Sequence, residues 1–325
     1  MRDIRVDTLR GLACIFLVAY HVVGSNPSIG LQLESGFLRE VSDLLKTVRM
    51  PLFTFLSGMV YAYRPLTENW PTFLKGKARR LLIPMLVVGT AFASIQSLVP
   101  GTSNEVENWW LLHIVPVQHF WFVEALFWVF VFIIPFELKR LFDNKFTVAT
   151  VICFFIFLAL EQPYSKYFGY KGFIYLAPFF LFGMSLVRFE VRTLSVLQSF
   201  LGFSLLMFAI YFCVNDVDGR SLIGCITGLF GCYFLFGLQL EIGWLAKIGI
   251  YSYSIYIFHV FFTAGSRIIL KQLPEFYIEV DFLISLILGI VGPIIVYFIA
   301  NKIPLGRLLL LGERGRKKTV IQEVV

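Results

Sequence analysis

The sequence predicts an all-α polytopic membrane protein with about ten transmembrane helices and with both termini on the cytoplasmic side. The first observation is composition: the 325 residues are 58% hydrophobic and only 15% charged, and the mean hydropathy is +0.78. The second is that apolar runs able to cross a bilayer recur along the whole chain. The third is that most of the 28 lysines and arginines fall in alternate loops, which by the positive-inside rule places both termini in the cytoplasm.

The net charge of +7 does not indicate a nucleic-acid partner, because the basic residues are spread over the loops that set orientation. We expect membrane lipid around the chain and leave its oligomeric state open. The chain divides into a transmembrane domain over 1–305 and a basic cytoplasmic tail over 306–325. The expected spans are 8–25, 49–64, 81–99, 119–138, 146–160, 173–188, 195–214, 221–240, 250–271 and 279–300.

The first span carries three ionisable side chains on one face. Eleven helical steps from Arg10 to His21 return to within roughly 20° of the same face and rise about 16 Å, and Asp7 lies within roughly 40° of that stripe. Ionisable groups are costly inside a membrane and mark functional sites. One interpretation is an anion held near one membrane face by Arg10 and proton chemistry at His21; the other is an Asp7–Arg10 pair and a histidine bonded to a backbone carbonyl.

Residues 37–48 place apolar side chains at helical spacing and predict an amphipathic helix on the outer membrane surface. The second span then opens at Arg49. This arginine either contacts a substrate on the outer side or extends to the membrane interface while its stem stays buried.

The third span opens with a cationic cluster that contains Lys77, Arg79 and Arg80. Ordinary positive-inside residues are one interpretation. The other is a cytoplasmic site for the phosphates of a nucleotide-bearing cofactor, because arginine forms strong bidentate contacts with phosphate.

The fourth span begins with His119 and Trp121 and places Glu124 among aromatic residues. A carboxylate in such surroundings is costly unless it is paired or protonated. Glu124 is therefore a candidate to orient a histidine, accept a sugar hydroxyl or pair with Arg49. His119 lies at the outer interface, either as a hydrated side chain or as a substrate contact.

In the ninth span, His259 is either a packed, hydrogen-bonded histidine or part of a site, and Arg267 is a weaker candidate for its outer side. The five cysteines lack metal-ligand spacing, so we expect no metal. We expect them to be small buried side chains, with a Cys213–Cys225 disulfide as an alternative.

These segments together resemble the acyltransferase-3 family of integral-membrane acyltransferases over nearly the whole chain. The resemblance rests on the order and spacing of several motifs rather than on any one of them. They are Asp7-x-x-Arg10-Gly with Arg10-x10-His21, Pro51-Leu-Phe-x-Phe-x-Ser57-Gly58, Arg79-Arg80 before Pro84, Trp121-Phe, and Ser252-Tyr-Ser-Ile-Tyr256-Ile-Phe-His259.

The resemblance implies transfer of an acyl group from cytoplasmic acyl-CoA to a glycan hydroxyl at the outer face. The family's first-helix arginine and histidine correspond to Arg10 and His21, with His21 as the catalytic residue. The family's Arg-x-x-Arg motif reads here as Lys77-Ala-Arg79-Arg80. This departure leaves open which cations bind CoA, because lysine lacks the guanidinium fork.

We therefore expect a multi-pass O-acyltransferase of the bacterial inner membrane. Its donor would be acyl-CoA, acetyl-CoA first and succinyl-CoA second, with no metal. Its acceptor would be an exopolysaccharide, a lipopolysaccharide or a lipid-linked sugar. His21 would act as general base supported by Glu124 or Asp7, or else form a covalent acyl-histidine. Arg49, His119, Trp121 and His259 are the expected substrate contacts.

Two other functions remain as alternatives. A secondary transporter or glycan exporter also uses intramembrane Arg, His and Glu, although the sequence shows no paired halves. A structural subunit of a polysaccharide-synthesis complex would not need His21. Thermal stabilisation by CoA would favour the enzyme over both.

Overall fold

The computed structural model describes residues 3–67, 69–99, 108–161, 165, 167–213, 218–270, 272 and 277–314. Within these residues the chain forms thirteen α-helices, four short 3-10 helices and no β-strand. The fold class predicted from the sequence is therefore confirmed.

The first seven α-helices are α1 (Ile4–Val23), α2 (Phe37–Leu44), α3 (Lys46–Ala62), α4 (Trp70–Leu98), α5 (Trp121–Leu138), α6 (Lys145–Leu160) and α7 (Tyr170–Arg188). The remaining six are α8 (Val196–Cys213), α9 (Leu222–Gly237), α10 (Gly243–Ile250), α11 (Ser252–Leu270), α12 (Ile278–Lys302) and α13 (Pro304–Leu311). The 3-10 helices are η1 (Trp109–Leu111), η2 (Gln118–Phe120), η3 (Leu141–Asp143) and η4 (Tyr167–Gly169).

Every one of the ten predicted spans coincides with a helix. Six segments are both long and apolar enough to cross a bilayer, namely those that contain α1, α4, α5, α7, α11 and α12. Three more, α6, α8 and α9, are shorter and apolar. The tenth, α3, lies in the core of the bundle. The chain is thus a multi-pass membrane protein, while the count of ten crossings and the cytoplasmic termini stay predictions.

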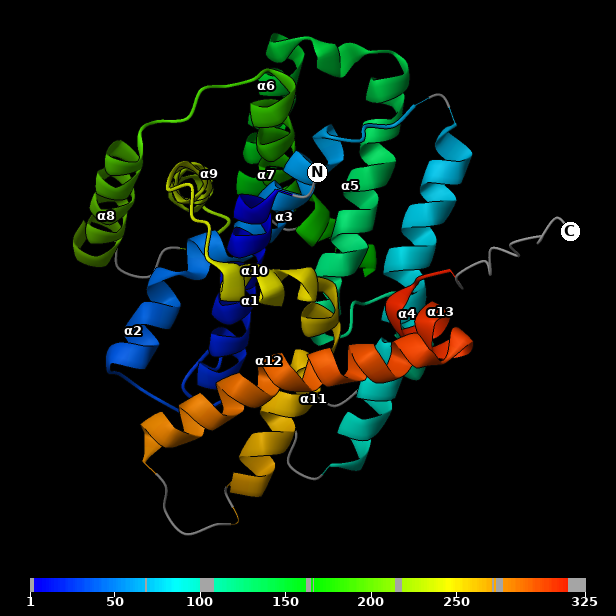
Figure 1. Cartoon of the computed structure of the whole chain (residues 1–325), viewed down its shortest axis with the longest axis vertical. Coiled ribbons are helices and arrows are strands. Elements are labelled where there is room, and N and C mark those ends of the chain that lie inside the picture. The colour runs from blue at the N-terminus through cyan, green and yellow to red at the C-terminus, as the bar shows by residue number, and fades with distance from the viewer. Residues whose placement is uncertain are drawn as a thin grey trace, which may run out of the picture.

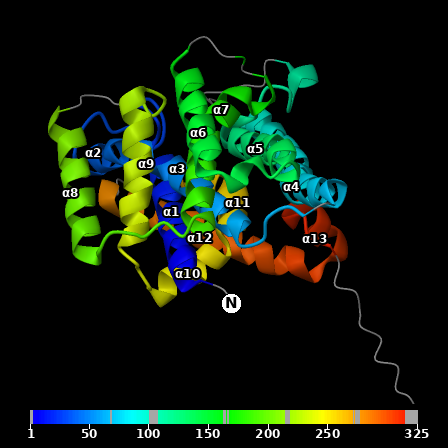
Figure 2. The ribbon, with the colours of Figure 1, turned by 90° about the horizontal axis from the view of Figure 1, so that it is seen from above.

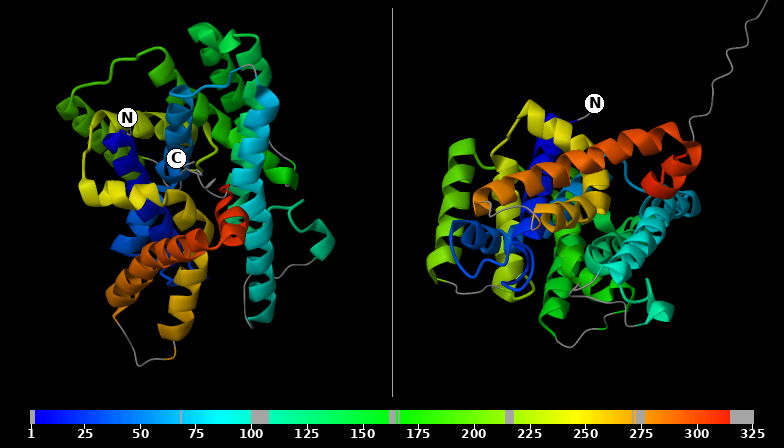
Figure 3. Two further views of the ribbon diagram at one scale, coloured as in Figure 1. Left: turned by 45° about the vertical axis from the view of Figure 1, so that its right-hand side comes forward. Right: turned by 90° about the horizontal axis from the view of Figure 1, so that it is seen from below.

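Helix α1 lies at the centre of the bundle and packs against α3, α10, α11 and α12. Figure 1 shows α12 crossing obliquely in front of α1 and α11 toward α4 and α13. Seen from above, α2, α8 and α9 gather on one side of α1, and α4 with α13 lies on the other (Figure 2). The left view of Figure 3 shows α13 beside the long helix α4. Because α1 is enclosed by these helices, more than half of its residues are buried, Asp7 and Thr8 among them.

The helix ends follow from local sequence. Asp3 accepts a hydrogen bond from the backbone N–H of Arg5 and begins α1, and Gly24, with a φ of 96°, ends it. Asn69 caps α4 and Ser221 caps α9 in the same way. Short polar side chains satisfy the free N–H groups of a first turn, and glycine adopts positive φ without strain.

Two boundaries and two short helices differ from the sequence prediction. The amphipathic helix ends at Leu44 instead of residue 48, because the chain turns at Leu45 and α3 begins at Lys46. The third span is preceded by about three further helical turns, since α4 begins at Trp70 and includes the basic cluster. The short helices α10 and α13 were not predicted, and α13 lies within the region assigned to the loop and tail after the last span.

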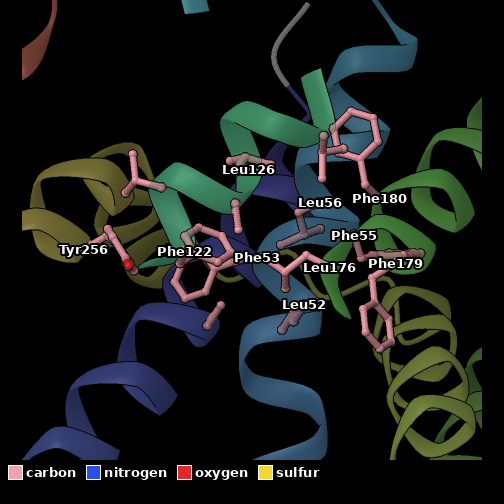
Figure 4. Packing of buried hydrophobic residues seen from close by; sticks show 14 of the residues in the cluster. Leu52, Phe53, Phe55, Leu56, Phe122, Leu126, Leu176, Phe179, Phe180 and Tyr256 are labelled. Carbon is pink, nitrogen blue, oxygen red and sulfur yellow. The ribbon is translucent and has the colours of Figure 1, made fainter. Parts of the chain in front are cut away.

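The core joins α3 closely to α7. A methyl group at Gly58 would overlap the backbone carbonyl of Phe180, and one at Gly183 would overlap that of Phe55. Small residues that let two backbones approach are a common basis of helix packing in membranes. Figure 4 shows the apolar side chains that fill the space around this contact and extend to Tyr256 of α11.

One of the described cysteines departs from the prediction of buried side chains. Cys225 is a free thiol, so the alternative disulfide to Cys213 is wrong. Cys14, Cys225 and Cys232 are buried as expected, but Cys153 is exposed on the outer surface of α6.

Candidate functional site

A partly open cavity of about 580 Å³ lies at the end of the bundle where α1 finishes. Its wall comes from the last turns of α1 and the loop after it, the start of α3, the end of α4, the η2–α5 junction and the second half of α11. All of these helix ends lie on the side that the sequence predicts to face outward.

Three histidines from distant parts of the chain meet beside this cavity. The ring centroids of His21 and His259 are 4.7 Å apart, those of His119 and His259 5.0 Å, and those of His21 and His119 5.9 Å. His119 and His259 are buried, whereas His21 is partly exposed and lines the cavity. We call these three residues the histidine cluster.

Backbone carbonyls fix the ring of His259. Its Nδ1 lies 2.9 Å from the carbonyl oxygen of Ile255 and 2.8 Å from that of Tyr256. Carbonyls only accept, so in the neutral ring we assign the proton to Nδ1 and the lone pair to Nε2. Among the described residues this Nε2 has no hydrogen-bond partner. His259 therefore presents a free acceptor inside the histidine cluster.

His119 is held in a similar way. Its Nε2 lies 3.5 Å from the carbonyl oxygen of Ile257, and its own backbone carbonyl accepts from the hydroxyl of Tyr256. Its Nδ1 has no partner within the described part of the chain. Two of the three rings thus present unpaired nitrogens next to the ring of His21.

Two arginines line the same cavity. The guanidinium of Arg49 lies over the ring of Tyr20, 3.5 Å from its centroid, and the residue is only 6% exposed. Arg267 donates from Nη1 to the backbone carbonyls of His21 and Val22, at 2.7 and 3.4 Å. These carbonyls end α1 and have no partner within the helix, so Arg267 both caps α1 and fixes the position of His21.

The backbone around the cavity contains unusual conformations. Gly24 and Gly30 have positive φ values, and a methyl group at either would overlap backbone on the opposite side of the loop they enclose. Gln32 and Gln118, which also line the cavity, have φ values of 56° and 44°. Positive φ is costly for residues other than glycine and is concentrated at functional sites.

Glu124 lies away from the cavity wall. It is buried one turn beyond Trp121, which does line the cavity, and its carboxylate faces the turn at Gly169. Its Oε2 has no hydrogen-bond partner among the residues that the structure describes, and no ion pair with Arg49 is formed there. Of the three roles considered for Glu124, the pairing with Arg49 is therefore not seen.

Asp7 and Arg10 lie at the other end of α1. Asp7 is buried, and its Oδ1 is 3.4 Å from Nη1 of Arg10. Fourteen helical steps separate Asp7 from His21, which is about 21 Å along the axis. This separation places Asp7 beside Arg10, where it cannot support His21 directly.

The basic cluster of α4 is spread over three surroundings. The ammonium of Lys77 lies 3.7 Å from the ring centroid of Phe130, in the contact between α4 and α5. Arg79 donates from Nε to the carbonyl of Gly312, 3.1 Å away, at the end of α13. Arg80 is exposed, and its backbone carbonyl accepts from the hydroxyl of Tyr253. Of the three, Arg80 presents its side chain most openly.

The structure thus brings His21, Arg49, His119 and Trp121 into one cavity wall with His259 behind it. Arg10, Asp7 and the α4 cations lie at the opposite end, and Glu124 lies apart from both. The sequence analysis missed Tyr20 and Gln118, and it ranked Arg267 low. Tyr20 precedes His21, and Gln118 precedes His119, so only their adjacency could have indicated a role. Within the described residues no group of three or more His, Cys, Asp or Glu side chains is arranged to hold a metal ion.

Residues 3–302 match the family model described as an acyltransferase domain of the acyltransferase-3 type. No curated protein and no solved structure shows significant similarity to the chain. The family match covers nearly the whole chain and agrees with the all-helical bundle and its enclosed polar site. The chain therefore belongs to the acyltransferase-3 family, and it is a multi-pass membrane acyltransferase.

Proposed function

We propose that this protein transfers an acyl group, acetyl in the first instance, from cytoplasmic acyl-CoA to a sugar hydroxyl of a surface glycan or lipid-linked sugar at the outer face of the bacterial inner membrane. The observation that carries the proposal is the position of His21. It is the least buried member of the histidine cluster and lines a cavity on the predicted outer side. A histidine so placed can take a proton from a substrate hydroxyl.

In the proposed reaction His21 accepts the hydroxyl proton of the acceptor as its oxygen attacks the thioester carbonyl. The carbon–sulfur bond then breaks, and the CoA sulfur leaves and takes up the proton from His21. The products are an O-acyl ester and free CoA. In the competing route, His21 attacks the thioester first and an acyl-imidazole reacts with the hydroxyl. Incubation with labelled acyl-CoA and no acceptor distinguishes the two, because only the second leaves label on the protein.

The donor is proposed to enter from the opposite end of α1. The phosphates of CoA would lie near Arg10 and Arg80, and the thioester would reach toward His21. The helical rise between Arg10 and His21 is about 16 Å, which an extended pantetheine arm can span. Lys77 and Arg79 already contact protein groups, so in this proposal their positive charges attract the CoA phosphates without binding them directly.

The test is mass spectrometry and NMR of surface glycans from a strain that lacks this gene, complemented with the native protein or with His21→Ala. We expect an O-linked acyl group to disappear and to return only with the native protein; the lost mass then identifies the acyl group. Unchanged acylation in every strain would contradict the proposal and favour the transporter alternative.

We predict that His259→Phe lowers kcat about 10–100-fold and leaves the KM for acyl-CoA unchanged. His259 touches no substrate in this scheme; its free Nε2 lies beside the ring of His21, with 4.7 Å between the ring centroids, and would accept a hydrogen bond from that ring once it is protonated. Losing such a buried acceptor costs about 1–3 kcal/mol, and each 1.36 kcal/mol is about tenfold in rate. His113→Phe is the matched control, because His113 bonds Thr90 outside the histidine cluster. Equal kcat values for the two variants would contradict a positioning role for His259.

We predict that Arg80→Gln raises the KM for acyl-CoA about five- to tenfold, in keeping with the loss of one charge-assisted contact. The rate at saturating donor should be unchanged, because Arg80 lies far from His21. Lys139→Gln removes a cation from another cytoplasmic loop and should leave the KM as it is. The measurement is a donor titration in lipid nanodiscs at two salt concentrations.

A further inference from the structure

Arg49 is a buried cation that forms no ion pair with a carboxylate of the described residues. It is 6% exposed, and its Nη1 has no hydrogen-bond partner among the described residues. Its guanidinium lies against the face of the Tyr20 ring. A buried charge without a counter-ion is costly, and a π face compensates it only in part.

The two described acids that interact electrostatically with Arg49 and Arg267 already have partners. Asp43 attracts Arg49 electrostatically without contacting it, and its carboxylate forms an ion pair with Arg39 at 2.9 Å. Asp281, which acts on Arg267, accepts from the hydroxyl of Ser285 at 3.0 Å. Of the described residues that line the cavity, none is an aspartate or glutamate. The cavity wall thus carries two arginines and no acid.

The buried charge of Arg49 lies beside the reacting group. The guanidinium of Arg49 lies over the ring of Tyr20, and the centroid of that ring is 4.9 Å from that of His21. Arg267 binds the backbone carbonyl of His21 itself. A group bound to both arginines would therefore lie within one side-chain length of His21. The planar guanidinium fork matches carboxylate and phosphate.

We infer that the substrate in this cavity carries an anionic group, a carboxylate or a phosphate, that binds Arg49 and Arg267 beside His21. The inference rests on the proposed acyl transfer and narrows its substrate class. Two sources of the anion share this chemistry. The acceptor can supply it, as an acidic sugar or the phosphate of a lipid-linked sugar, or the acyl group can supply it, as the free carboxylate of a succinyl group.

The first experiment measures thermal stabilisation of the full chain in lipid nanodiscs by methyl glucuronide, glucose 1-phosphate and the neutral methyl glucoside. If the acceptor carries the anion, at least one anionic sugar should stabilise the native protein more than the neutral sugar does; equal effects of all three sugars would leave only the acyl group as its source, and equal use of succinyl-CoA by the native protein and Arg49→Gln would then overturn the inference. Arg49→Gln should lower that apparent affinity at least tenfold. Arg220→Gln is the matched control, since Arg220 also lies beside a tyrosine ring but outside the cavity.

The second experiment separates the two sources of the anion. Succinyl-CoA and acetyl-CoA are compared as donors for the native protein and for Arg49→Gln. If the acyl group carries the anion, the variant loses at least tenfold in kcat/KM with succinyl-CoA and keeps its activity with acetyl-CoA. If the acceptor carries it, both donors lose activity equally and the acceptor KM rises.

The melting temperature without ligand separates substrate binding from a structural role of Arg49. If Arg49 serves to bind substrate, Arg49→Gln removes an uncompensated buried charge, and its melting temperature should equal or exceed that of the native protein. If Arg49 is structural, the melting temperature should fall. Arg49→Lys, which keeps the charge but not the fork, should restore part of the activity. In the strain that lacks the gene, Arg49→Gln and His21→Ala are compared by complementation. Full glycan acylation with Arg49→Gln and none with His21→Ala would overturn the inference about the anion, while the proposed acyl transfer would stand. A melting temperature of Arg49→Gln well below the native value would overturn the inference about the anion too.

Discussion

Replacing His21 with alanine is expected to lower acyl transfer by about 10²–10⁴-fold, the usual contribution of a general base. Alanine removes the only proton acceptor of the histidine cluster that is both partly exposed and on the cavity wall. The covalent route also predicts a loss of activity, because the nucleophile disappears with the ring. The measurement is release of free CoA from acetyl-CoA by the purified protein in nanodiscs, with surface glycan as acceptor.

Binding and folding should survive this change. The backbone carbonyl of His21 still accepts from Arg267, and Leu17 and Val18 keep α1 packed in the core. We therefore expect the thermal stabilisation by CoA to match that of the native protein. His113→Ala serves as the control histidine. Retention of more than a tenth of the native turnover by His21→Ala would show that another group accepts the proton.

Gly183→Ala, a single methyl addition in the α3–α7 contact, is expected to be strongly destabilising. The added carbon would overlap the backbone carbonyl of Phe55, and no side-chain rotation can relieve a clash with backbone. Overpacking a core costs about 1–3 kcal/mol and sometimes more, and here two helices must separate to accommodate it. We expect a clear fall in melting temperature and in the yield of folded protein from the membrane.

Gly76→Ala is the matched control for this prediction. Gly76 is also helical, in α4, but a methyl group there meets nothing within 4 Å. Alanine is the better helix former by up to about 1 kcal/mol, so this variant should be as stable as the native protein or more so. If both alanine variants melt at the native temperature, the close approach of α3 and α7 does not limit stability.

Hydrophobicity made the helices predictable. Each long apolar run became a helix because a chain in lipid must satisfy its own backbone hydrogen bonds. The errors lie where that constraint is weak. Residues 46–48 fitted an amphipathic pattern and an apolar span equally well, and the turn at Leu45 decides between them. The α10 helix has eight residues, too few for a span, and its position depends on Gly11 and Gly249, which let it approach the backbone of α1.

The site was predictable only along single helices. Helical geometry correctly separated Arg10 from His21, because both lie on α1. The meeting of His21 with His119 and His259 depends on how three distant segments pack, which no spacing in the sequence encodes. The same holds for Glu124, because the turn at Gly169 that it faces approaches α5 only in the folded bundle.

The helix α11 joins the two ends of the molecule. Near its first turn Tyr253 binds the backbone of Arg80, near its middle His259 lies in the histidine cluster, and near its last turn Arg267 holds the end of α1. These three contacts share one continuous helix of 19 residues, about 28 Å long. Because the helix is continuous, the distances between these three residues along its axis are fixed. A tilt or axial shift imposed at Tyr253 must therefore also move His259 and Arg267.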